Sequence, residues 1–60
     1  MSALTLDDCA LILESLEYTQ DAFRRYNYPS PEVRAQRLQD VRSAIEHMRK
    51  LRDELKRGTA

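Results

Sequence analysis

The sequence has little cysteine, glycine, proline or tryptophan: its 60 residues include one cysteine, one glycine, two prolines and no tryptophan. A lone Cys9 excludes a disulfide framework, and the single His47, far from Cys9 in sequence, leaves no candidate metal cluster. A single Gly58 excludes a glycine-rich phosphate-binding loop. The residues therefore predict no metal, no cofactor and no catalytic site, and we expect a protein that is not an enzyme.

Long hydrophobic runs are also missing, since the longest covers only residues 9–13. A secretory signal needs a basic start followed by an apolar stretch of roughly 7–15 residues. Here the first basic residue is Arg24. The pattern predicts a cytoplasmic protein with a reduced thiol and no membrane segment.

The sequence has no net charge, because ten basic residues balance ten acidic residues. The two signs are separated along the chain: acidic residues dominate residues 1–28 and basic residues dominate the remainder. The second half can therefore attract the first half of its own or of a neighbouring chain. A net charge of zero also makes nucleic acid an unlikely partner.

The signals for helices, in contrast, are abundant. Thr5 and Asp8 have the spacing of a capping box, and acidic residues follow in the first turn. Pro29 disfavours helical geometry at Tyr28, and Asn27 tolerates a left-handed helix end. These signals predict a first helix over residues 6–27.

A second helix is predicted over residues 31–57. Ser30 is a suitable N-cap, Pro31 suits the first helical position, and Gly58 is a natural stop. The connection over residues 28–30 is so short that the helices must be antiparallel neighbours. We therefore expect one all-α domain over residues 1–60, an antiparallel two-helix hairpin.

The hydrophobic pattern exceeds what such a hairpin covers. Both helices carry an apolar stripe with spacings of three and four residues, and the first carries a second stripe on its other side. A domain this short is marginally stable alone. We therefore expect a homodimeric four-helix bundle or a larger helical oligomer. The candidate interface residues are Leu11, Leu13, Leu16, Tyr18, Ala22, Val41, Ile45, Met48 and Leu55.

The expected architecture is similar to that of the Rop-type RNA-binding helical hairpin, which also dimerises into a four-helix bundle. The resemblance concerns the architecture alone, so it transfers no functional residue to this chain.

One region departs from the apolar pattern, at the end of the hairpin where the chain turns. Aromatic and arginine side chains gather there, and such groups can stack on a base and neutralise a phosphate. Alternatively, Arg34 and Arg37 form ion pairs with Asp21 and Glu17 while the tyrosines fill the turn or an interface. We call this set the turn-end cluster: Phe23, Arg24, Arg25, Tyr26, Tyr28, Arg34 and Arg37.

Three functions remain open. The first is a small regulatory or interaction protein of bacterial or phage type, which self-associates and binds a protein target through exposed helical faces. The second is an oligomer that sequesters a small anionic, nucleotide-like ligand at the turn-end cluster. The third is an RNA- or DNA-binding regulator of the Rop kind, whose affinity would fall steeply with salt.

Overall fold

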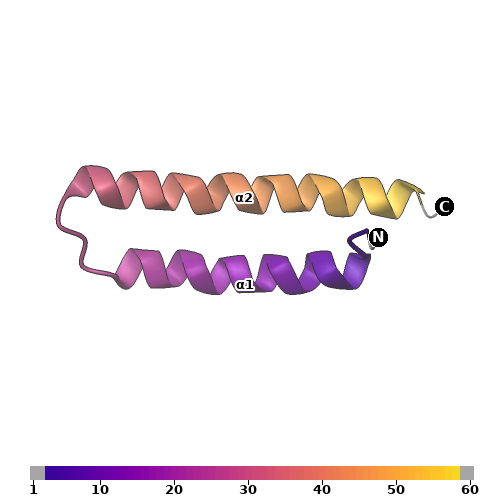
Figure 1. Ribbon diagram of the computed structural model, residues 1–60, viewed down its shortest axis with the longest axis horizontal. Helices are drawn as coiled ribbons and strands as arrows, with labels where there is room; N and C mark the ends of the chain where they lie inside the picture. The colour runs from indigo at the N-terminus through magenta and orange to yellow at the C-terminus, as the bar shows by residue number, and fades with distance from the viewer. Residues whose placement is uncertain (1–2, 59–60) are drawn as a thin grey trace.

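The computed structural model describes residues 3–58, which form two α-helices that lie side by side (Figure 1). Helix α1 spans Leu6–Arg25 and helix α2 spans Pro31–Gly58. The start of α1 and the end of α2 lie at the same end of the molecule, so the helices are antiparallel. The expected all-α hairpin is thus confirmed. Within residues 3–58, neither helix combines the length and the apolar composition that a bilayer-spanning segment needs.

Both helices begin where the caps predict. The hydroxyl of Thr5 accepts a hydrogen bond from the Asp8 amide at 3.1 Å, and the Asp8 carboxylate accepts one from the Thr5 amide at 3.0 Å. At α2, the Ser30 hydroxyl accepts a hydrogen bond from the Val33 amide at 3.2 Å, and Pro31 is the first helical residue. These contacts satisfy amides that have no partner inside their helices.

Helix α1 ends earlier than the sequence suggests, at Arg25 rather than at residue 27, so the connection covers residues 26–30. Tyr26 closes the helix with an extended backbone (φ −69°, ψ 138°), and its amide still bonds to the carbonyl of Ala22. The left-handed end expected at Asn27 is wrong, because no non-glycine residue described here has a positive φ. With Tyr26 extended, the centroids of the Tyr26 and Tyr28 rings lie 4.7 Å apart. Helix α2 runs one residue beyond the expected end.

The core between the helices is small. Cys9, Val41 and Ile45 are 0%, 4% and 8% exposed. The chain exposes 4918 Å² in all, whereas a compact monomer of its mass would expose roughly 4,000 Å². Its radius of gyration is 14.1 Å, against about 10 Å for a compact domain of this length. The hairpin is therefore a single layer with much uncovered apolar surface.

Helical geometry divides this surface into two flanks. Residues three positions after the core residues Cys9 and Val41 lie on one side of the hairpin, and residues four positions after them lie on the other. Residues seven and fourteen positions after the core residues lean toward the first side, and Leu51 follows Ala44 by seven; the members below are apolar and half-buried. We call this side the apolar flank: Ile12, Leu16, Ala44, Met48, Leu51 and Leu55.

Candidate functional site

The structure gathers the turn-end cluster at the closed end of the hairpin, as the fold requires. Phe23 and Tyr28 are half-buried, while the other members are exposed. Arg34 and Arg37 are among the exposed members. The cluster therefore lies on the surface, at the rim of the helix pair.

Arg34 connects the two helices. Its guanidinium donates a hydrogen bond to the backbone carbonyl of Arg24, in the last turn of α1. That carbonyl has no partner within its own helix, and a cation there also interacts favourably with the negative end of the helix dipole. Among residues 3–58, neither Arg34 nor Arg37 forms the ion pair expected with an acidic residue of α1. Asp21 instead pairs with Arg24 on its own helix, at 3.7 Å.

Arg37 contacts an aromatic ring instead of a carboxylate. Its guanidinium carbon lies 4.7 Å from the centre of the Phe23 ring, which is a cation–π contact. The Phe23 ring meets Tyr28 edge to face, with centroids 6.4 Å apart at 78°, and Tyr28 packs against Tyr26. These four side chains form a continuous row that holds the connection against both helices.

Two hollows of about 360 Å³ and 370 Å³ lie at the turn end, next to this row. Tyr26 and Tyr28 line both of them. Arg34 lines the first, together with the residues of the connection, and Arg37 lines the second. Each hollow thus combines aromatic faces with one guanidinium, a combination that suits an anionic group next to a flat ring.

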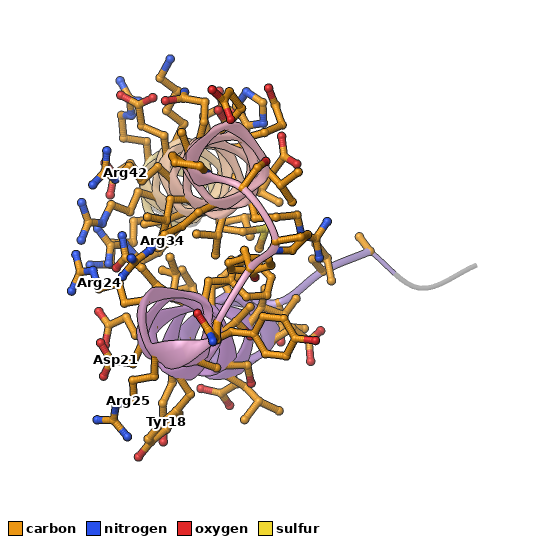
Figure 2. The ribbon with its side chains drawn as sticks, turned by 90° about the vertical axis from the view of Figure 1, so that its left-hand side faces the viewer. Tyr18, Asp21, Arg24, Arg25, Arg34 and Arg42 are labelled. Carbon is orange, nitrogen blue, oxygen red and sulfur yellow. The ribbon has the colours of Figure 1, made fainter. Side chains whose placement is uncertain are left out.

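Arginines continue along one side of the molecule. Figure 2 shows Arg24, Arg34 and Arg42 on the same side of the hairpin, contributed by both helices. A hollow of about 400 Å³ on this side is lined mainly by polar side chains, including Arg42, Glu46 and Arg49. Helical geometry places this arginine flank opposite the apolar flank. Asp21, labelled beside the arginines in Figure 2, interrupts the arginine flank. Arg42 is not among the candidate residues predicted from the sequence, because it belongs to no recognisable motif.

The second stripe of α1 is fully uncovered. Leu11 is 65% exposed, Tyr18 is 71% exposed, and Ala22 is exposed beside them. Figure 2 shows Tyr18 projecting from α1 on the side away from α2. Leu11 lies about 160° around the helix from buried Cys9, at about 100° per residue. We call Leu11, Tyr18 and Ala22 the outer face of α1.

The remaining interface candidates fall into two groups. Val41 and Ile45 are already buried within the single chain, so they leave little area for a second molecule. Leu13, Leu16, Met48 and Leu55 are half-buried and keep apolar surface uncovered. Ile12, Ala44 and Leu51 were not among the interface candidates predicted from the sequence, although their spacing from the core residues places them on the same side of the hairpin.

Among residues 3–58, histidine, cysteine and acidic side chains form no group of three that could hold a metal ion. Cys9 is buried, while His47 is exposed.

Comparison with family models, with curated proteins and with solved structures finds no match for this chain.

Proposed function

We propose that this chain is a small, non-enzymatic, oligomeric interaction protein that binds a protein target through exposed helical faces. The outer face of α1 is the observation that supports this function best. Leu11 and Tyr18 are large and exposed, and they lie two helical turns apart on one helix face, on the side opposite to the core. Apolar side chains grouped in this way are typical of partner-binding surfaces, and tyrosine is enriched in them.

The charges beside the outer face suggest the chemistry of the target. Three acidic residues, Asp7, Glu14 and Asp21, lie along one edge of this face with Arg25, and all four are exposed, so the edge is acidic overall. Electrostatic complementarity then favours a target helix whose apolar stripe is bordered by lysine or arginine. Binding of such a helix would inhibit the target or hold it in an assembly.

Site-specific photo-crosslinking tests this function. A photoreactive benzoylphenylalanine in place of Tyr18, in cells of the source organism, should give a covalent adduct with a different polypeptide. Leu11→Glu should remove that adduct. The matched control carries the same photoreactive residue at Lys50, which is exposed on α2. Adducts formed only with the chain itself, or equally from both positions, would contradict the proposal.

A small anionic ligand is the second candidate function, supported by the hollow that Tyr26, Tyr28 and Arg34 line. Calorimetric titration with a nucleoside monophosphate should then show saturable heat that Tyr26→Ser abolishes.

An RNA or DNA partner is the third candidate, supported by the arginine flank, although Asp21 and Glu46 interrupt that flank. Such binding would weaken steeply between low and moderate salt.

A further inference from the structure

We infer that a second copy of this chain packs antiparallel on the apolar flank, so that the turn of each hairpin lies beside the chain ends of the other. This inference rests on the self-association proposed above. It adds the surface that the second copy covers and the direction in which it lies.

The uncovered area matches what a stable dimer needs. The chain exposes 4918 Å², about 900 Å² more than a compact monomer of its mass. A standard-size protein interface buries about 800 Å² on each partner. The apolar flank is the side on which this area is most apolar, because the opposite flank carries Arg24, Arg34 and Arg42. A second copy is therefore an occupant of suitable size and chemistry.

The middle of α2 offers a complementary contact. Ala44 and Met48 lie one turn apart on the apolar flank, near the midpoint of Pro31–Gly58. A two-fold axis between them, perpendicular to the helix, places Ala44 of each copy against Met48 of the other. A small residue then faces a large one, which lets the two helices pack closely. In this register the two α2 helices overlap along nearly their full length.

The charges at the rim of the apolar flank select the antiparallel direction. Arg37 lies at the turn end, whereas Asp8 and Glu54 lie at the end with the chain termini. In a parallel dimer, Asp8 and Glu54 of both copies would collect at one end, and the two Arg37 side chains at the other end would have only Asp40 to offset them. In the antiparallel register, Arg37 of each copy lies at the level of Glu54 of the second copy. Asp40 on the same rim already accepts a hydrogen bond from Gln36, at 2.9 Å.

A spin-label distance tests the direction. Glu32 is exposed in the first turn of α2, so a nitroxide on Glu32→Cys, in a Cys9→Ala background, leaves the apolar flank untouched. Electron–electron double resonance should give a distance of about 40 Å between the labels of an antiparallel dimer, from the helical rise of 1.5 Å per residue. A parallel dimer would give at most about 30 Å. That shorter distance would overturn the inference but keep the proposed self-association, whereas a folded monomer in sedimentation would overturn both.

A charge exchange tests the predicted contact. Arg37→Glu and Glu54→Arg should each weaken dimerisation about tenfold, because the symmetric dimer holds two such pairs. The combined variant should recover most of the lost affinity. Arg37 also contacts Phe23 within its own chain, and the combined variant does not restore that contact, so recovery reports the pair between copies. Arg42→Glu, on the opposite flank, is the matched control and should leave the affinity unchanged. Additive losses in the combined variant would overturn the inference.

Discussion

Arg34 connects the two helices through a single side chain, since its guanidinium bonds to the carbonyl of Arg24. We expect Arg34→Gln to lower the free energy of unfolding by about 1 kcal/mol, because a carbonyl at the end of α1 loses its donor. Urea denaturation at a fixed protein concentration measures the change. Arg42→Gln is the control, since Arg42 is exposed on the same flank and makes no hydrogen bond or ion pair within the described part of the chain.

Unchanged or higher stability in Arg34→Gln would contradict this role. If the same substitution also abolished the binding of a nucleoside monophosphate, Arg34 would belong to a ligand site and the second candidate function would gain support. The two roles thus predict opposite changes in stability.

The sequence predicted that these arginines lie at the turn end of the molecule, but the ion pairs considered for them do not form within residues 3–58. One of the two alternatives paired Arg34 and Arg37 with acidic side chains of α1, whereas Arg34 contacts a backbone carbonyl and Arg37 contacts the Phe23 ring. Residue types and spacings predict which helix ends meet. They do not predict which atom of a neighbouring helix lies within reach, because that depends on the relative rotation of the two helices.

The helix caps contribute to stability at the scale of the elements. Thr5→Ala and Ser30→Ala should each lower the free energy of unfolding by about 1 kcal/mol, because each hydroxyl satisfies an amide that its helix leaves free. Circular dichroism during thermal unfolding measures the loss. Ser15→Ala is the matched control inside α1, and it should raise stability slightly, since alanine has the higher helix propensity. Equal effects at all three positions would contradict the role of the caps.

The helix starts were predictable and the end of α1 was not. Each cap is a contact over three residues, so the sequence near Thr5 and Ser30 contains all the information it needs. The end at Arg25 coincides with contacts from further away: Arg34 bonds to Arg24 ten residues before it, and Tyr26 packs on Tyr28. Local propensity alone extends the helix to Asn27.

The stability of the whole molecule should depend on its concentration. If folding and self-association are linked, the midpoint of thermal unfolding rises by roughly 5 °C for each tenfold increase in protein concentration. Met48→Lys places a charge on the apolar flank, so it should lower this midpoint and shift the protein toward monomer in sedimentation. Leu11→Ser, on the outer face, should leave the assembly state unchanged. A folded monomer whose midpoint is independent of concentration would contradict the proposed oligomer.

The periodicity of both helices predicted the hairpin and also the excess of apolar surface. The sequence predicted only in part how that surface divides into flanks. Val41 and Ile45 were predicted to lie in the oligomer interface, whereas the single chain already buries both. An apolar residue looks the same in sequence whether its own chain or a second copy covers it, and only the packing of α1 on α2 separates the two cases.

The burial of Cys9 gives the molecule an internal reporter of its own dynamics. The side chain is 0% exposed between the helices, and it is the only thiol in the sequence. A thiol reagent can reach its sulfur only after α1 separates from α2. The rate of alkylation at low reagent concentration therefore measures how often the hairpin opens, and any partner that holds the helices together must slow the reaction in proportion.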